Sequence, residues 1–373
     1  MKEGWEYKKL GEVCKIYQPQ TIASSLLKED GKYPVFGANG MIGRYDSYNH
    51  EDPEVLLCCR GATCGAINVS LPFSWINGNA MVVKPINDSF LKGFLRYILL
   101  TLDYSHIITG AAQPQITRTS LSPVTVPVPT IIEQQSIVDY IDSAFAKIDA
   151  MKANAEKALN EAKALFQASL KEMLEPKEGW EEKALKDFAK DMYRGSGVKR
   201  DQVTEKGISC VRYGEIYTKY NFHFNKCASH TLAEYVNSPK YFEYGDILFA
   251  ITGESVEEIG KSIAYTGKEK CIAGGDIVVM KHNYEPRYIS YALSTPSAIK
   301  QKGHGKTKLK VVHTNIPSLK EIIIPIAPMN EQIIIAETLD SLKSKVDRLQ
   351  ENYDKITQEC DALKQAILRK VFE

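Results

Sequence analysis

Basic and amide side chains in glycine-containing loops give this 373-residue chain groups that can contact nucleic acid. Residues 299–310 place five lysines around two glycines, a composition suited to binding phosphate and releasing counterions. Arginine, asparagine and glutamine match the edges of guanine and adenine. Each alone is more often an ordinary surface residue, and a lone lysine run is more often a solvated loop, but the set occurs in both halves of the chain. The candidate DNA-binding residues are Asn39, Arg44, Tyr45, Arg60, Thr63, Asn77, Asn79, Gln113, Gln115, Arg118, Arg194, Lys199, Arg200, Lys302, His304, Lys306 and Lys308.

No catalytic motif accompanies these residues. Gly260–Ser262 and Gly305–Thr307 resemble the end of a phosphate-binding loop, G-x-x-x-x-G-K-[ST], but the first required glycine is replaced by Ser255 and Lys300. The seven histidines lack helical metal-ligand spacing, and no two of the eight cysteines form a C-x2-C pair. The absence of these motifs is weak evidence against enzymes in general and stronger evidence against an ATPase, a nucleotide-cofactor enzyme or a common hydrolase, and the spacings indicate no metal site.

Composition leaves the partner open. A formal net charge of +1 argues neither for nor against nucleic acid, because a binding surface is local. Scattered cysteines, an N-terminus without an apolar segment and apolar runs too short to span a bilayer favour a cytoplasmic protein that does not enter a membrane.

An internal repeat organises the chain. Glu3–Glu6 recurs as Glu178–Glu181 at an offset of 175, and Leu121–Gln135 aligns with Leu319–Ile333 at an offset of 198. The second repeat thus carries 23 extra residues between these motifs. We predict two complete repeats, 1–175 and 176–373. The aligned motifs share Pro127 and Pro325, Glu133 and Glu331, Gln134 and Gln332, and the ends Ala164–Leu170 and Ala362–Leu368.

Each repeat ends in a predicted long helix. Ile131–Leu174 and Met329–Glu373 lack glycine and proline, and apolar residues recur there in heptad steps. A helix of about 42 residues is about 63 Å long, too long for one small core. This apolar stripe, called the seam below, comprises Ile137, Ile141, Ile148, Leu165, Leu339, Leu342, Val346, Leu349, Ile356, Leu363 and Ile367.

The short connection Glu175–Lys177 favours an antiparallel helix pair. In that pair the small seam residues Ala155, Ala158 and Ala162 would face Leu349, Val346 and Leu342. Thr130 and Glu133 are spaced as a capping box for the first helix.

The remaining sequence predicts two β-rich globular domains of mixed α/β type, with short helices over 90–102 and 286–302. The fold class is α+β, with a pseudo-two-fold repeat and an antiparallel pair of long coiled-coil helices separating the globular domains. The expected domains are 1–130 and 176–328 for the globular parts, and 131–175 and 329–373 for the helices.

The whole chain resembles the specificity subunit of Type I restriction–modification systems. The resemblance rests on the repeated Glu-Gly-Trp, the proline strand followed by Glu-Gln, and the repeated A-L-x-Q-A-x-L helix ending. Two further stretches, Tyr33–Gly43 and Gly245–Phe249, are similar to those of target-recognition domains in that family.

This resemblance implies two target-recognition domains, each recognising one half of a bipartite, asymmetric sequence in double-stranded DNA. It implies that the helices fix the spacer and dock two methyltransferase subunits, and that restriction/motor subunits join. S-adenosylmethionine, ATP and Mg would be bound by those partners, so this chain would be non-catalytic. Two alternatives remain: the specificity subunit of a Type IIB-like system, and a coiled-coil interaction scaffold that binds no DNA. Salt-dependent DNA binding would exclude the scaffold.

Overall fold

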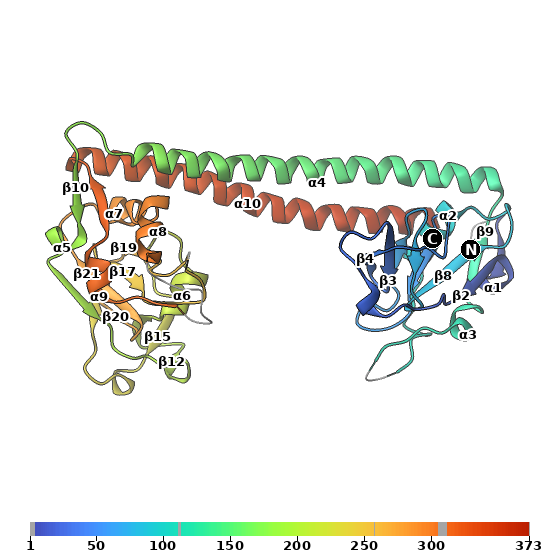
Figure 1. Cartoon of the computed structure of the whole chain (residues 1–373), viewed down its shortest axis with the longest axis horizontal. Coiled ribbons are helices and arrows are strands. Elements are labelled where there is room, and N and C mark those ends of the chain that lie inside the picture. The colour runs from blue at the N-terminus through green and yellow to red at the C-terminus, as the bar shows by residue number, and fades with distance from the viewer. Residues whose placement is uncertain (1–3, 111–112, 257, 305–311, 373) are drawn as a thin grey trace. The chain divides into compact units, whose positions relative to one another are not determined.

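The computed structural model describes residues 4–110, 113–256, 258–304 and 312–372 (Figure 1). Contacts divide the chain into a first unit, residues 1–156 with 353–373, and a second unit, residues 157–352. Each unit holds one globular part together with a segment of both long helices. The division therefore crosses the helices, whereas the sequence predicted the helices as separate domains.

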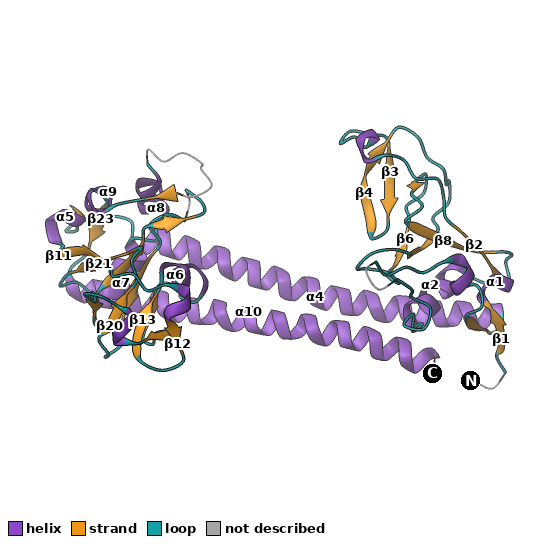
Figure 2. Ribbon diagram, turned by 90° about the horizontal axis from the view of Figure 1, so that it is seen from below, coloured by secondary structure: helices purple, strands orange, loops and turns teal. Residues whose placement is uncertain are grey.

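A four-stranded antiparallel sheet and a three-stranded sheet build the globular part of the first unit (Figure 2). Helix α2, Lys92–Thr101, buries Phe94, Leu95 and Ile98 in the same core as the larger sheet. In spatial order the larger sheet is β2 (Cys14–Tyr17), β8 (Ala80–Pro85), β5 (Val55–Cys58) and β6 (Ile67–Val69), and the smaller is β4 (Gly40–Tyr45), β3 (Tyr33–Gly37) and β7 (Trp75–Ile76).

The second unit repeats this plan with larger sheets, which accommodate its extra residues. One sheet runs β11 (Asp191–Arg194), β21 (Ile277–Lys281), β17 (Ile247–Ala250), β19 (Ser262–Tyr265) and β14 (His223–Phe224). The other runs β12 (Val203–Thr204), β15 (Ser229–Thr231), β13 (Ile208–Val211), β20 (Cys271–Ala273) and β16 (Tyr241–Phe242).

The predicted helix 286–302 is instead two helices, α7 (Pro286–Ala292) and α8 (Pro296–Gly303). Pro296 separates them because proline lacks the N–H that a continuous helix requires, and it is tolerated only in a first turn. The remaining short elements are α1 (Leu10–Val13), η1 (Ser24–Leu26), α3 (Arg118–Leu121), α5 (Leu185–Phe188), η2 (Arg200–Gln202), α6 (Tyr213–Thr218), η3 (Ala233–Tyr235) and α9 (Ile316–Lys320).

The two repeated sequence motifs pair with each other in both units. The repeated stretch Glu3–Glu6 is called the tryptophan motif and the repeated stretch Leu121–Gln135 the proline motif. Strand β1, Glu6–Lys9, begins at the end of the tryptophan motif and pairs antiparallel with β9, Thr125–Val128, in the proline motif. Strands β10, Glu181–Ala184, and β23, Ile323–Ile326, do the same in the second unit. The sequence repeat is therefore a structural repeat.

Helices α4, Ile131–Met173, and α10, Met329–Phe372, match the predicted glycine- and proline-free stretches. The capping box is confirmed: Thr130 N–H donates to Glu133 Oε2 at 3.1 Å, and Glu133 N–H donates to Thr130 Oγ1 at 3.3 Å. Hydrogen bonds from Thr130 and, more weakly, from Trp5 lower the pKa of Glu133. In the second unit Trp180 Nε1 donates to Glu331 Oε2 at 3.1 Å, so the tryptophan motif contacts the helix start there as well.

The helix segments are antiparallel inside each unit. In the first unit, early α4 contacts late α10 through Asp149 and Lys364, whose charged atoms are 2.5 Å apart. In the second unit, late α4 contacts early α10, and Lys163 Nζ donates to Gln350 Oε1 at 2.8 Å. The predicted register would have placed Lys163 near residue 341, so the pairing is shifted along the helix.

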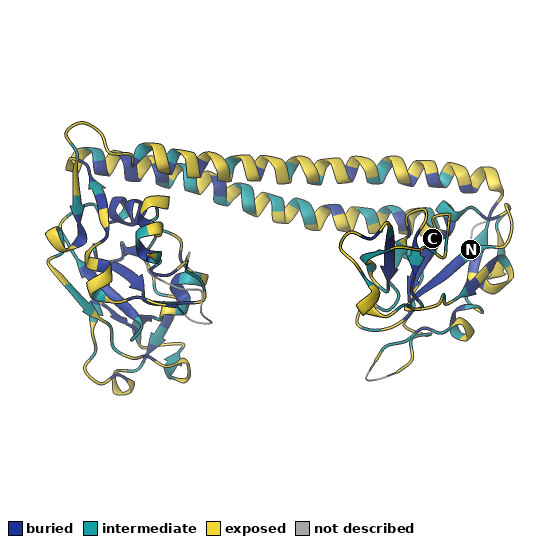
Figure 3. Cartoon of the chain, viewed as in Figure 1, coloured by how far each residue is buried: buried dark blue, intermediate teal, exposed yellow. Residues whose placement is uncertain are grey.

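The burial of side chains along α4 and α10 corrects the predicted set of seam residues (Figure 3). Leu165 and Leu363 are 60% and 48% exposed, so their assignment to the seam is wrong, whereas Leu159 and Phe166 are buried. A strict seven-residue repeat drifts about 20° per heptad from the 3.6-residue turn, and the buried face of α4 follows the natural helix period. The other predicted seam residues are buried or half-buried.

Two buried glutamines tie the long helices to the globular parts. Gln134 accepts from Leu91 N–H at 2.8 Å and donates to the carbonyls of Ser89 and Pro129, both at 2.9 Å. Gln332 repeats the arrangement, accepting from Glu285 N–H at 3.0 Å and donating to Ala327 O at 2.7 Å. Leu91 and Glu285 are the N-cap residues of α2 and α7, so each glutamine joins the start of a short helix to the start of a long one.

We predict that Gln134→Ala lowers the free energy of unfolding by about 2–4 kcal/mol, because it leaves a buried N–H and two carbonyls without partners. Gln135→Ala is the matched control. Gln135 is exposed, and among the described residues its side chain bonds only Asp139, at 2.8 Å, so its loss should cost less than about 0.5 kcal/mol. Thermal and urea unfolding of both variants measure this difference, and equal effects would contradict the anchoring role.

Candidate nucleic-acid interface

Four loop segments of the first unit join at the ends of β2, β5 and β8. Cys59 N–H donates to Asn79 O at 3.2 Å, and Ile116 N–H donates to Cys59 O at 3.0 Å. Gln18 Nε2 donates to Gly78 O at 2.9 Å, which adds the segment after β2. Gly78 permits this approach, because a Cβ there would lie 2.6 Å from Pro19 O. We call residues 18–21, 59–64, 77–79 and 113–118 the first loop cluster.

The first loop cluster brings together seven of the candidates predicted from sequence, six of them at least partly exposed. Arg60 and Gln115 lie side by side as partners in an isolated β-bridge. No ion pair with another described residue engages Arg60 or Arg118, so both guanidinium groups are available. The exposed members are Arg60, Thr63, Asn79, Gln113 and Arg118, and Gln115 is half-buried. This surface offers donors and acceptors of the kinds that recognise base edges.

Two candidates of the first unit, Asn77 inside the cluster and Arg44 outside it, bind other parts of the protein. Asn77 is 6% exposed, and its Oδ1 accepts from Ile22 N–H at 3.0 Å. Arg44 donates to the carbonyls of Gly31 and Lys32 at 2.5 and 2.8 Å. Base contact by Asn77 or Arg44 is therefore not supported, because their polar atoms are already bound. Tyr45 packs edge-on against Trp75 with ring centroids 5.5 Å apart, and Asn39 is exposed in the β3–β4 turn.

The second unit builds the same backbone frame. Ile251 N–H donates to Asp276 O, and Thr314 N–H donates to Ile251 O, both at 3.0 Å. The bridge between Arg60 and Gln115 has its equivalent in the pairing of β18, Thr252–Gly253, with β22, Val312–His313. We call residues 194–199, 251–256, 274–276 and 312–315 the second loop cluster.

Sequence reasoning missed Thr252 and His313, which occupy the positions of Arg60 and Gln115. Thr252 Oγ1 and His313 Nδ1 lie 3.1 Å apart. The offset of 198 between the repeats leads from Gln115 to His313, so aligning the two repeats would have identified His313 as a candidate. The two clusters therefore share a frame but present different side chains.

Charge also differs between the clusters. The guanidinium of Arg194 forms an ion pair with Asp276 and a hydrogen bond to Gly275 O, so it is not a free cation as predicted. Glu254 is exposed in the same cluster. Lys199 and Arg200 are exposed at the start of η2 and stay candidates.

Lys302 is not a surface phosphate contact. It is only 5% exposed, and its Nζ donates to Leu293 O at 2.7 Å and Ser262 Oγ at 3.0 Å. Burial without a carboxylate partner lowers its pKa to about 7. His304 is exposed, whereas Lys306 and Lys308 lie outside the described residues.

Lys302 should make stability depend on pH. Between pH 7 and about 10 the unfolded lysine holds more proton than the folded one, so the free energy of unfolding rises with pH. The slope from this residue approaches about 1.4 kcal/mol per pH unit. The free energy of unfolding is measured against pH for the wild type and for Lys302→Met. The difference between the two curves gives the contribution of Lys302. Lys300→Met, which changes an exposed lysine on the same helix, should retain the slope. A wild-type slope unchanged by Lys302→Met would contradict the buried neutral lysine.

The structure places no membrane-crossing helix or metal cluster among its described residues. No helix there is both long and apolar enough to span a bilayer, and no three His, Cys, Asp or Glu side chains are grouped to hold a metal ion.

Comparison with known proteins shows that this chain is similar to a curated protein and to two solved structures. The chain is 22% identical over 364 residues to a putative type I restriction enzyme specificity subunit of Haemophilus influenzae, covering 93% of this chain and 89% of that protein. A chain from a structure of complex assembly and conformational transition in a type I R-M system superposes with a TM-score of 0.70 at 17% identity, covering 100% of this chain and 98% of that one. The HsdS subunit from Thermoanaerobacter tengcongensis gives a TM-score of 0.56 at 16% identity, covering 100% and 97%. The structural likenesses support the α+β, two-repeat fold.

A family model extends across nearly the whole chain. The model of the Type I restriction modification DNA specificity domain matches residues 2–161 and 177–358, one match in each repeat. These ranges contain both loop clusters and the start of each long helix. The chain belongs to the family of Type I restriction modification DNA specificity domains, which it carries twice.

Proposed function

We propose that this chain is the DNA-recognition subunit of a Type I restriction–modification complex and that each globular part recognises one half of a bipartite target. One observation carries the proposal: the same loop frame is built twice, with Arg60 and Gln115 in the first cluster and Thr252 and His313 in the second. A shared frame with different side chains suits two different half-sites, and hence an asymmetric target.

The chemistry of the clusters indicates how recognition would occur. Arg60 can donate a bidentate pair to guanine, and Gln115 can pair with adenine. In the second cluster, Thr252, His313 and the carboxylate of Glu254 offer other contacts, including acceptance from the cytosine amino group. The exposed cations Lys199 and Arg200 suit the phosphate backbone, which positions a protein without specifying sequence.

The starts of the long helices offer docking surfaces for two methyltransferase subunits. Ile132 at the start of α4 is 79% exposed, and Ile334 at the start of α10 is 58% exposed. Their neighbours Ile131 and Ile333 are 41% and 39% exposed, so each helix start carries adjacent exposed apolar side chains, and an exposed apolar patch is typical of a protein–protein interaction site. The docked methyltransferases would supply S-adenosylmethionine chemistry, and restriction/motor subunits would use ATP and Mg. Recognition in this chain then requires no cofactor of its own, and the cytoplasm is the expected location.

Co-expression with a cognate methyltransferase, followed by mapping of methylated adenines, tests the proposal. A split, asymmetric methylated sequence is expected. If the active partner carries nuclease and methyltransferase in one polypeptide, the Type IIB-like alternative holds. If the assembled complex binds DNA without any dependence on salt concentration or methylates no defined sequence, the recognition role is wrong.

A further inference from the structure

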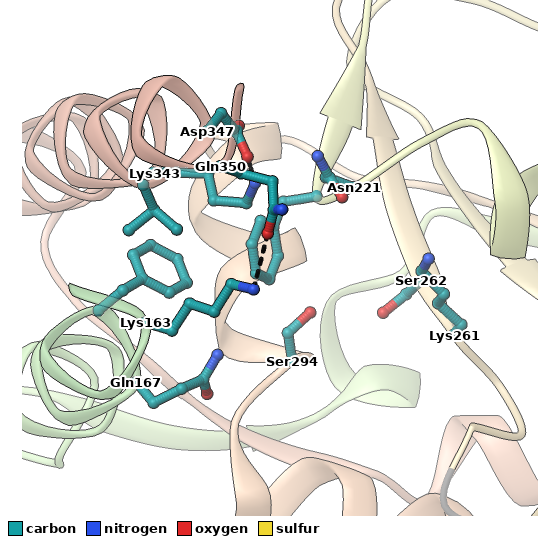
Figure 4. Close-up of a pocket in the computed structure, with 12 residues that line it drawn as sticks. Lys163, Gln167, Asn221, Lys261, Ser262, Ser294, Lys343, Asp347 and Gln350 are labelled. Atoms are coloured by element: carbon teal, nitrogen blue, oxygen red, sulfur yellow. Dashed lines mark hydrogen bonds and ion pairs between the residues drawn. The ribbon is translucent and has the colours of Figure 1, made fainter. Parts of the chain in front are cut away.

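A cleft of about 410 Å³ opens in the second unit where α4 and α10 meet the globular part (Figure 4). Its size lies within the range of about 300–1,000 Å³ for small-molecule sites. All the residues that line it belong to the second unit. The cleft is separate from the second loop cluster, so the proposed DNA contacts do not account for it.

Positive charge dominates this cleft. Three lysines line it, and Asp347, the one carboxylate in the lining, already forms an ion pair with Lys343. Lys163 Nζ donates to the neutral amide of Gln350 at 2.8 Å, and Lys261 Nζ donates to Tyr220 O at 3.1 Å. Two ammonium groups therefore lack an anionic hydrogen-bond partner among the described residues.

The buried side chain of Lys302 lies directly behind the lining. Ser262 is 2% exposed, lines the cleft, and accepts a hydrogen bond from Lys302 Nζ at 3.0 Å. No acceptor for the Ser262 hydroxyl hydrogen exists among the described residues, so this O–H can donate to a ligand. Lys302 has no carboxylate partner among the described residues, and an anion near Ser262 would favour its protonated form.

Aromatic side chains supply an apolar surface in the same cleft. The rings of Phe166 and Phe222 both line it, with centroids 5.6 Å apart. Phe222 precedes β14, the fifth strand of the sheet β11–β21–β17–β19–β14, whose counterpart in the first unit has four strands. At the repeat position of Lys343, the first unit has Phe145, which packs beneath Lys364 at 5.1 Å. The charge of the cleft is therefore not a requirement of the repeated fold.

We propose that this cleft binds a phosphate-bearing ligand of nucleotide size. The phosphate would lie at Lys163, Lys261 and the Ser262 hydroxyl, because lysine binds phosphate as a point charge and hydroxyls donate to its oxygens. The planar part of the ligand would pack against Phe166 and Phe222. The inference concerns a small ligand and stands apart from DNA recognition by the loop clusters.

Calorimetric titration of the full-length chain, without DNA, tests this site with AMP, inorganic phosphate and adenosine as probes. AMP should bind, and adenosine and inorganic phosphate should each bind at least tenfold more weakly. Lys163→Gln combined with Lys261→Gln should raise the Kd for AMP at least tenfold. Lys163→Gln alone, which changes an exposed side chain, should weaken AMP binding in a normally folded protein.

Lys157→Gln is the matched control, because Lys157 is exposed on α4 outside the cleft and its one ion pair among the described residues is with Glu161, at 3.8 Å. Its AMP affinity should equal that of the wild type. No binding at millimolar AMP, or equal affinity in the wild type and the cleft variants, would overturn the site. Adenosine or inorganic phosphate binding as tightly as AMP would overturn the ligand class. Because no DNA is present, none of these outcomes bears on the proposed recognition function, which methylation mapping tests separately.

Discussion

Replacing Arg60 and Gln115 together by alanine should abolish methylation of the natural target while leaving the complex assembled. Each base contact of this kind discriminates by about 1–3 kcal/mol, so the pair is expected to contribute about 2–6 kcal/mol to specific binding. Both side chains emanate from one β-bridge on the first loop cluster, so removing them should erase one half-site only. Methylation mapping and DNA binding at fixed salt concentration measure the effect.

Arg96→Ala provides the control for this double substitution. Arg96 is exposed on α2 and lies over the Tyr97 ring at 5.3 Å, away from the loop cluster. Its replacement should leave the methylated sequence unchanged. If the Arg60 and Gln115 variant still methylates the original sequence at the wild-type rate, the first loop cluster does not recognise bases.

Shortening both long helices should change the spacer and preserve both half-sites. Removing residues 150–156 of α4 and 357–363 of α10 deletes seven residues from each antiparallel segment of the first unit and retains the ion pair between Asp149 and Lys364. Seven residues correspond to about 10.5 Å of helix, or about three base pairs at 3.4 Å each. The methylated motif should therefore keep its two halves with about three fewer base pairs between them.

A deletion in α4 alone also tests whether the paired helices set the spacer length. It would shift the buried face of one helix past the other and leave residues such as Ile141 and Leu368 without their packing partners. Assembly should then be lost, as gel filtration would show. If the paired deletion changed the bases of a half-site instead of the spacer, the helices would not set the spacing.

Regular features of the chain could be predicted from the sequence because their causes are local. The absence of glycine and proline from α4 and α10 and the Thr130 and Glu133 cap each depend on residues near one another in sequence, and the repeat follows from aligning two stretches of the same chain. Heptad counting failed at Leu165 because small departures from the helix period accumulate over a helix of 43 residues.

Side-chain roles in the loops depend on distant partners, which a sequence alone does not show. Lys302 looked like a phosphate ligand because lysines surround it, yet Ser262 and Leu293 enclose its ammonium group. Asn77 has the side chain of a base contact but holds Ile22. Thr252 and His313 carry no distinctive motif, and only the repeated backbone frame makes them the equivalents of Arg60 and Gln115.

The shared helices also set the order in which the protein can mature during synthesis. The first unit takes Leu368 and Phe372 into its core, with the Phe372 ring 5.6 Å from that of Phe94. These residues leave the ribosome more than 200 residues after residues 1–156 of that unit, which at about 5–20 residues per second takes about 10–40 s. During that interval the core around Phe94 lacks its cover, so the globular part made first completes its packing last.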